Sequence, residues 1–276
     1  MGYRTQDLIF TLYGDYIAPR GDEAWIGHII ELMGVLNISP QAVRSTLSRM
    51  MRKGWLRSRR EGRHSFYAIT PKTESLLADG RRRIYHPRQE PWDGCWHILT
   101  YSISEDQRHL RNRLRQRLIW LGFGRLGSAV WISPRDLRRE VRQVTERLKI
   151  SDQVDVFSGE YLGLSDPRDL VERCWNLDQL HSAYQEFIDR HRAAWQHYTN
   201  QVNNNSASAR QAFVRRFLLV HEYRSFPYVD PNLPSDLLPD DWLGYEAIHL
   251  FQSYAALLAP KANEFVDVVL STEPSG

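Results

Sequence analysis

A set of hydrogen-bond donors recurs at helical spacing between residues 39 and 53, and its chemistry suits an anionic polymer. Guanidinium groups form paired hydrogen bonds to phosphate or guanine, and amides and hydroxyls reach other base edges. The first polar members suit base edges, whereas the last three cations suit phosphates. The predicted DNA-contacting set on this segment is Ser39, Gln41, Arg44, Ser45, Ser48, Arg49, Arg52 and Lys53.

A helix would hold these donors on one face, and the local sequence contains residues typical of a helix start and a helix end. Ser39 is a favourable N-cap, Pro40 suits the first helical position, and Gly54 suits the position just past the end. The opposite face is apolar at helical spacing, through Val43, Leu47 and Met50. We therefore expect a helix from Pro40 that ends before Gly54.

A basic hairpin is predicted to follow this helix. Two strands are expected at Trp55–Ser58 and Ser65–Ile69, with a charged turn over residues 59–63. Helix and hairpin in this order form the second half of a winged helix-turn-helix, so the sequence predicts binding to duplex DNA. The alternative is a solvent-exposed turn. The cations expected over the DNA backbone or minor groove are Arg59, Arg60, Arg63 and His64.

Further helices complete the predicted DNA-binding domain, which we place at residues 1–88. Apolar spacing predicts a helix at Thr5–Tyr13, ending at Gly14, and another at Ala24–Leu36. Thr70 as N-cap and Pro71 at the first helical position predict the start of a further helix. A proline-rich polar connector, residues 86–91, then ends the domain.

The distribution of charge supports the same interpretation. The whole chain has a formal net charge of only +3, but residues 1–90 hold 15 Lys and Arg against 9 Asp and Glu. Between Arg44 and Arg63 there are 8 basic residues and one acidic residue, Glu61. A basic patch in one small module is expected of a DNA-binding protein, because each neutralised phosphate releases counterions. The alternative is a solvated basic helix face.

Other features exclude several classes. The chain of 276 residues has no run of eighteen apolar residues, so we expect no transmembrane span and no membrane partner. Its first residues lack a basic region followed by an apolar core, so no secretory signal is expected. Cys95 and Cys174 form no disulfide framework and have no zinc-ligand spacing. We expect a cytoplasmic, nucleoid-associated protein.

The rest of the chain predicts two more domains, giving a multidomain α+β protein. Residues 91–165 alternate strands and helices in an order typical of a ferredoxin-like α+β domain. Its expected elements are strands at 96–103, 128–133 and 153–157, a helix at 105–121, and a helix entered at Ser133-Pro134. Residues 166–276 are expected to be mainly helical. The expected helices are 170–198, as one or two, then 209–226 and 245–258, with a packed tail after Pro260.

Several motifs, spread in order over nearly the whole chain, resemble the PaaX-type repressors. The matching stretches are Ile38–Met50, Trp92-Asp93-Gly94 leading to Trp96, Leu121–Gly124, Val130–Pro134 and Leu219–Pro227. The resemblance implies a winged-helix domain, a middle domain similar to a CRISPR adaptation nuclease, and a helical C-terminal domain. It also implies a bacterial homodimeric repressor of phenylacetate catabolism. An aryl-CoA thioester, typically phenylacetyl-CoA, would release it from its operator.

An acyl-CoA effector needs cations for its phosphates and an apolar slot for its aryl group. Two polar clusters are candidates, and each has a structural alternative. For Arg125 and Trp131 the alternative is a tight turn with a core tryptophan. For the cluster around His221 it is a buried, hydrogen-bonded contact that holds the C-terminal domain to the middle domain. In a helix, His221 and Arg224 share a face, and Arg216 lies on the same face as Arg224. The candidate effector residues are Arg125, Trp131, Arg216, His221, Glu222, Tyr223 and Arg224.

A metal-dependent nuclease built on the middle domain is the alternative function. In the nuclease that the domain resembles, a metal-binding aspartate follows the tyrosine at the end of the first strand. Here Tyr101 is followed by Ser102, which lacks the anionic oxygen that magnesium prefers. Asp106 is a few residues further on and is better suited to the positive end of a helix. We therefore expect no enzyme activity, catalytic residue, metal site or cofactor, and expect the middle domain to dimerise.

Overall fold

The computed structural model describes residues 3–85, 91–163 and 165–273. The chain forms two compact units, each built from separate parts of the sequence. Unit 1 contains residues 1–86, 187–224 and 246–276, and unit 2 contains residues 87–186 and 225–245. Most of the predicted connector, residues 86–90, lies outside the described residues. In the described part of the chain, no helix is long and apolar enough to span a membrane.

The first part of unit 1 combines four helices with a small antiparallel sheet. The sheet has the order β1-β3-β2. Its elements in chain order are α1 (Thr5–Leu12), β1 (Glu23–Trp25), α2 (Ile26–Gly34), α3 (Pro40–Arg52), β2 (Leu56–Glu61), β3 (His64–Ile69) and α4 (Pro71–Tyr85).

Helix α3 begins and ends as its sequence predicts. The Ser39 hydroxyl accepts a hydrogen bond from the Ala42 backbone N–H at 3.3 Å, and Pro40 occupies the first helical position. After Arg52 the chain passes Lys53 to Gly54, whose φ of +68° is favourable for glycine. The predicted apolar face is confirmed, since Val43, Leu47 and Met50 are fully buried.

The helices before α3 differ from those that the sequence predicts. The helix from Thr5 does not end at Gly14 but continues as a π-helical turn, Tyr13–Ile17, and a 3₁₀ turn, Ala18–Arg20. Burial of Tyr13, Tyr16 and Ile17 against the core outweighs the helix-breaking tendency of the glycine. The predicted helix at Ala24–Leu36 starts only at Ile26, because the residues before it pair with β3.

Three long helices complete unit 1: most of α8 (Leu177–Asn203), α9 (Ala209–Tyr223) and α11 (Gly244–Ser271). The predicted helix at 209–226 ends at Tyr223, and the short α10 (Phe226–Val229) follows. The predicted helix at 245–258 extends through Pro260 to Ser271. Proline removes one backbone hydrogen bond, but the residues after it continue the buried stripe with Ala262, Val266 and Val269.

A buried ion pair joins the N-terminal and C-terminal parts of unit 1. The Arg216 guanidinium on α9 contacts the Asp15 carboxylate, and the two side chains are 12% and 8% exposed. The Tyr85 hydroxyl on α4 donates to the same carboxylate at 2.7 Å and accepts from Arg216 at 3.3 Å. Helix α1 also packs against both α3 and α9. The first 85 residues therefore share a core with the C-terminal helices.

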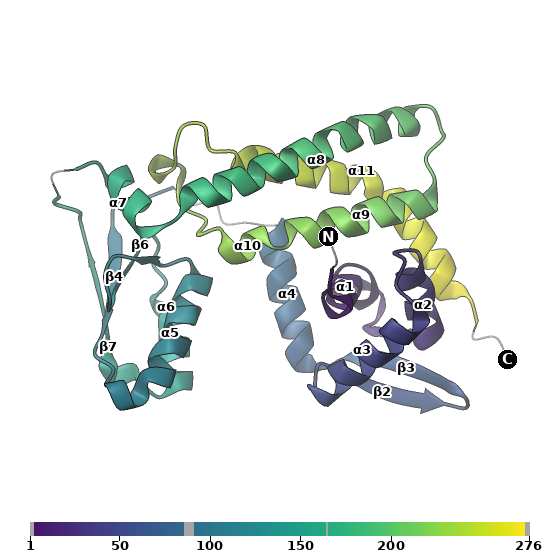
Figure 1. Cartoon of the computed structure of the whole chain (residues 1–276), viewed down its shortest axis with the longest axis horizontal. Coiled ribbons are helices and arrows are strands. Elements are labelled where there is room, and N and C mark those ends of the chain that lie inside the picture. Colours follow the sequence, from purple (N-terminus) through teal and green to yellow (C-terminus); the bar gives the residue numbers. More distant parts are fainter. Residues whose placement is uncertain (1–2, 86–90, 164, 274–276) are drawn as a thin grey trace. The chain divides into compact units, whose positions relative to one another are not determined.

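Unit 2 contains a four-stranded antiparallel sheet in the order β5-β6-β4-β7. Helices α5 and α6 lie side by side on one of its faces (Figure 1). Its core includes Leu99, Leu114, Leu118, Trp131 and Val141. The elements are β4 (Trp96–Tyr101), α5 (Arg108–Leu121), β5 (Gly124–Arg125), β6 (Val130–Ser133), α6 (Arg138–Leu148), β7 (Val154–Gly159), α7 (Pro167–Cys174), the start of α8, and α10.

Two predicted boundaries in unit 2 are corrected. Strand β4 ends at Tyr101 instead of Ile103, and α6 begins at Arg138 instead of at Ser133-Pro134. The Ser133 hydroxyl accepts from the Arg135 backbone N–H at 3.1 Å, so it closes a turn and does not cap the helix. After α5, Gly122 has a φ of +93°, and a Cβ there would lie 2.9 Å from the Pro231 carbonyl oxygen. Only glycine fits this position.

We expect Arg216→Ala to lower the free energy of unfolding by about 3–5 kcal/mol, because it leaves the Asp15 carboxylate buried without its cation. Urea unfolding measures the change. Arg210→Ala removes an exposed arginine from the same helix and serves as the control. A loss no larger than that of Arg210→Ala would contradict the structural role of the pair.

Candidate nucleic-acid interface

The polar face of α3 is exposed along the whole helix. Its exposed members include Gln41, Arg44, Ser48 and Arg52. Neither Arg44 nor Arg52 has a hydrogen bond or ion pair to the part of the chain that the structure describes. Their guanidinium groups are therefore available to an external anion.

Other members of this face are partly engaged by the helix itself. The Ser45 hydroxyl donates to the Ala42 carbonyl at 3.1 Å, and one Arg49 nitrogen donates to the Thr46 hydroxyl at 2.9 Å. The Arg49 bond uses only part of its guanidinium group, which offers five N–H donors. Both side chains remain exposed, so these contacts orient the groups without covering them.

The C-terminal end of α3 is fixed against the first helix. Lys53 donates to the Gln6 side-chain oxygen at 3.4 Å, and its ammonium group lies 5.8 Å from the centre of the Trp55 ring. The Trp55 ring in turn contacts Phe10 of α1 at a centroid distance of 4.4 Å. Helix α1 thus packs against α3, the helix predicted to contact DNA bases, on the side away from its exposed polar face.

The hairpin is longer than predicted, and its turn is shorter. Arg59 and Arg60 belong to β2, and the turn consists of Gly62 and Arg63. The Arg60 guanidinium donates to the Gly62 carbonyl at 3.1 Å. Pairing of β2 with β3 continues to Glu61↔His64, because Gly62 with a φ of +56° allows a tight connection.

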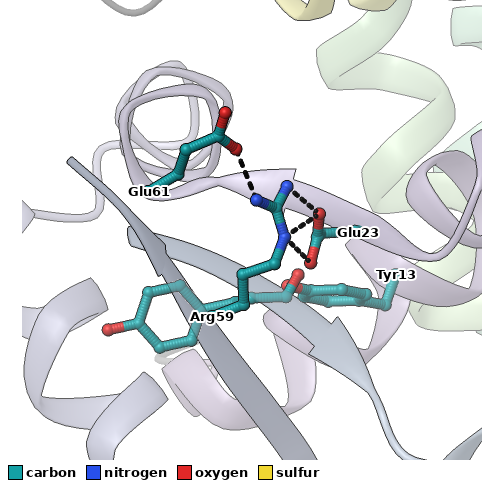
Figure 2. Close-up of polar contacts among 5 residues, drawn as sticks. Tyr13, Glu23, Arg59 and Glu61 are labelled. Atoms are coloured by element: carbon teal, nitrogen blue, oxygen red, sulfur yellow. Dashed lines mark hydrogen bonds and ion pairs between the residues drawn. The ribbon is translucent and has the colours of Figure 1, made fainter. Parts of the chain in front are cut away.

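Arg59 is held by the protein's own carboxylates. Its guanidinium donates to Glu23 of β1 at 2.7 Å and also contacts Glu61, as Figure 2 shows. It lies 4.4 Å from the centre of the Phe66 ring, opposite it on β3. The hydrogen bonds that Arg59 donates to Glu23 and Glu61 raise its pKa above the ordinary value. This arginine therefore links all three strands of the sheet.

Arg57 is a further cation of the hairpin, outside the predicted DNA-contacting set. It lies in β2 and is exposed, with no ion pair to the described residues. Its signal in the sequence is the alternation of Arg57 and Arg59 with Ser58 between them, because residues two apart lie on the same face of a strand. Arg57 and Arg63 are the hairpin arginines that the described residues leave without an ion pair or hydrogen bond.

The polar cluster near the end of α9 holds four helices together. His221 is only 7% exposed, and its Nδ1 lies 2.8 Å from the Thr11 hydroxyl of α1. Burial, reinforced by the charge of Arg224, lowers the pKa of His221 to about 4. The neighbouring Tyr223 ring stacks on Phe251 of α11 at a centroid distance of 4.0 Å.

Glu222 connects the same cluster to α8. It accepts hydrogen bonds from Tyr3 at 2.6 Å and from Arg190 at 2.9 Å, and it contacts His191 at 2.9 Å. Burial alone would raise the pKa of Glu222, but hydrogen bonds from His191, Tyr3 and Arg190 outweigh it and hold the pKa at about 2. The carboxylate is therefore charged at neutral pH.

The candidate effector residues lie in both units. Arg125 and Trp131 belong to unit 2, whereas Arg216 and residues 221–224 belong to unit 1. Arg125 is exposed and donates to the Gly127 carbonyl at 3.1 Å, and Trp131 is 2% exposed within the core. The structure does not test their role in effector binding, which stays a prediction.

Tyr101 and Ser102 occupy the positions that correspond to the metal-binding end of the first strand in the nuclease alternative. Tyr101 ends β4, and its hydroxyl donates to the Ser128 carbonyl at 2.9 Å and accepts from Arg115 at 2.8 Å. Ser102 follows it, exposed, without a carboxylate. Among the described residues, no group of three His, Cys, Asp or Glu side chains is placed to hold a metal ion.

We expect Glu61→Gln to strengthen binding to duplex DNA of random sequence and to steepen the slope of log K against log[salt] by about 1. The substitution removes an anion from the hairpin and weakens one of the two carboxylate contacts that hold the Arg59 guanidinium. Fluorescence anisotropy over a salt series measures the slope. The control, Glu172→Gln on α7, makes the same charge change. Equal behaviour of the two variants would contradict the prediction.

Because the pKa of His221 is low in the folded chain, we expect the free energy of unfolding to decrease as the pH is lowered. The unfolded chain takes up a proton near pH 6.5, whereas the folded chain does so near pH 4, so acidification between these values favours unfolding. We expect a loss on the order of 2 kcal/mol over this range. In His221→Gln the loss should disappear above pH 4.5, where Glu222 does not yet contribute. Urea unfolding at several pH values measures it, and an unchanged pH dependence in the variant would refute this assignment.

Comparison with known proteins places the chain in a family. Three family models match it: PaaX-like protein over residues 4–73, PaaX protein central Cas2-like domain over residues 89–171, and PaaX-like protein C-terminal domain over residues 175–268. Transcriptional repressor PaaX of Escherichia coli (strain K12) is 34% identical over 262 residues, which are 94% of this chain and 82% of that protein.

A solved structure has a similar fold. Uncharacterized protein Rv0674 from Mycobacterium tuberculosis matches with a TM-score of 0.62 and 22% identity, over 96% of this chain and 98% of that chain. This likeness concerns the fold alone. The family models and the E. coli relative together confirm the resemblance found in the sequence: the chain belongs to the PaaX family.

Proposed function

We propose that this chain is a transcriptional repressor that occupies operator DNA in the cytoplasm. The observation that carries the proposal is the exposed face of α3, on which Arg44 and Arg52 have no ion pair or hydrogen bond within the described residues, followed by the basic hairpin β2–β3. The repressor named in the family, 34% identical to this chain, supports the same function.

The proposed reading unit is a winged helix-turn-helix at residues 1–88. The order α1, β1, α2, α3, β2, β3 supports it, since α3 would then enter the major groove and the hairpin would form the wing. Gln41, Arg44, Ser45 and Ser48 would meet base edges, and Arg49, Arg52 and Lys53 would meet phosphates. Arg60, Arg63 and His64 would act from the wing, and Arg59 would hold the wing in shape.

We propose that residues 91–165 form a ferredoxin-like domain through which two copies of the chain associate as a homodimer. The antiparallel order β5-β6-β4-β7, with α5 and α6 on one face, supports this fold. A dimer would present two reading helices to two half-sites of the operator. Residues 166–276 would supply the helical C-terminal part. The absence of a carboxylate at Ser102 disfavours the nuclease alternative.

The proposed effector is an aryl-CoA thioester such as phenylacetyl-CoA, as in a regulator of phenylacetate catabolism. To release DNA, it must bind the conformation that fits DNA poorly several kcal/mol more tightly than the one that fits. The position of α1 between α3 and α9 supports a route for such coupling within unit 1. Arg125, Trp131, Arg216 and residues 221–224 remain the proposed effector contacts.

An electrophoretic mobility shift on the chain's own upstream promoter DNA tests this function. We expect a shifted complex that phenylacetyl-CoA abolishes, whereas free phenylacetate and plain CoA leave it intact. A shift that no thioester changes would remove the effector proposal and keep DNA binding. The absence of any shift at moderate salt would refute the repressor proposal.

A variant of α3 locates the reading surface in the same assay. Arg44→Ala should weaken operator binding by about 1–3 kcal/mol, the value of one paired contact to a base, with a smaller effect on random DNA. Arg210→Ala, exposed on α9, is the matched control. Equal operator affinity of the two variants would place the reading surface elsewhere.

A further inference from the structure

A second concentration of positive charge lies outside the proposed reading unit. Residues 108–149 hold twelve Lys and Arg against three Asp and Glu, whereas residues 1–90 hold 15 against 9. This segment contains α5 and α6, which cover one face of the unit 2 sheet (Figure 1). The charge is therefore concentrated on one layer of a single domain.

Packing leaves the cationic sides of the two helices open. Leu114 and Leu118 of α5 and Val141 of α6 face the sheet core. Five arginines around these apolar stripes are exposed and have no ion pair or hydrogen bond to the described residues. They are Arg113 and Arg117 of α5 and Arg139, Arg142 and Arg147 of α6. We call these five residues the helix-layer patch.

Other arginines of this segment have a structural role, because they form hydrogen bonds or ion pairs within unit 2. Arg111 donates to Glu105 at 2.8 Å, Arg115 donates to the Tyr101 hydroxyl at 2.8 Å, and Arg138 pairs with Asp136 at 2.7 Å. These side chains fix a helix start, a strand end and a turn. The five arginines of the helix-layer patch have no such contacts, so the fold does not account for them.

The sequence of α5 is also unfavourable for a merely solvated helix. Its 14 residues contain five arginines and no carboxylate. Exposed helices usually alternate charges so that residues four apart attract each other, but Arg113 and Arg117 repel each other at this spacing. An external polyanion would relieve this repulsion.

We propose that the helix-layer patch binds the phosphate backbone of duplex DNA without reading its sequence. This rests on the proposed function, because it gives the same DNA a second contact surface on the repressor. A helix of this length extends about 21 Å, a distance along which duplex DNA presents about twelve phosphates. Cations spread along two helices suit such a polymer, whereas a small phosphate ligand needs convergent donors.

Salt-dependent binding of the full chain to duplex DNA of random sequence tests the patch. In R113Q/R117Q and in R139Q/R142Q, the slope of log K against log[salt] should become less steep by about 2, because each lost phosphate contact removes about 0.9. R173Q/R210Q, which removes two exposed arginines outside the patch, should keep the wild-type slope. Thermal melting confirms that each variant is folded.

The α3 variant R44Q/R52Q separates this proposal from the proposed function. If only R44Q/R52Q flattens the slope, the patch does not bind DNA and the inference is overturned, while the reading helix stands. If only the patch variants flatten it, the inference stands and the reading surface is misplaced. Calorimetric binding of plain CoA that R139Q/R142Q abolishes, or tighter binding of single-stranded RNA than of duplex DNA, would overturn the inference.

Discussion

The buried contact between Asp15 and Arg216 is the constraint on which unit 1 depends. Two charges taken out of water are costly, and only good geometry with further hydrogen bonds offsets the cost. Here Tyr85 supplies such a bond, so segments from α4, α9 and the turn after α1 must meet in one arrangement. Apolar packing alone tolerates small shifts between helices, whereas the hydrogen bonds of this trio require a defined geometry. Its contribution is therefore specificity of assembly as much as stability.

That arrangement gives α1 two neighbours of different kinds. One side supports α3, through contacts such as Phe10 with Trp55, and the other side packs on α9, where Thr11 meets His221. The α9 cluster also engages α8 through Glu222 and α11 through Tyr223. Helix α9 is thus in direct contact with the helix that supports the proposed reading surface. An effector that changes the packing of the C-terminal helices has a short physical route to α3.

The sequence predicted those features that local chemistry determines. The cap at Ser39, the glycine after α3 and the apolar spacing between them depend on neighbouring residues, and the structure confirms them. Features set by distant residues were missed. Gly14 stays helical and α11 passes Pro260 because tertiary burial outweighs propensity. The pairing of Arg59 with Glu23 is another such feature, because the two residues are 36 positions apart in sequence. The contacts with DNA and effector stay predictions.

The composition of unit 1 has a consequence for how the protein is made. Its core joins the first 86 residues to residues 187–224 and 246–276, so many of its contacts have a large sequence separation. Contacts of this kind form late and slow folding, because a long loop must close first. During synthesis the N-terminal segment leaves the ribosome without the helices that bury α1 and neutralise Asp15. Domains normally fold in order from the N-terminus, but here the complete core of unit 1 forms only after α9 and α11 have been synthesised. The segment proposed to read DNA is thus synthesised before the helices that complete its core.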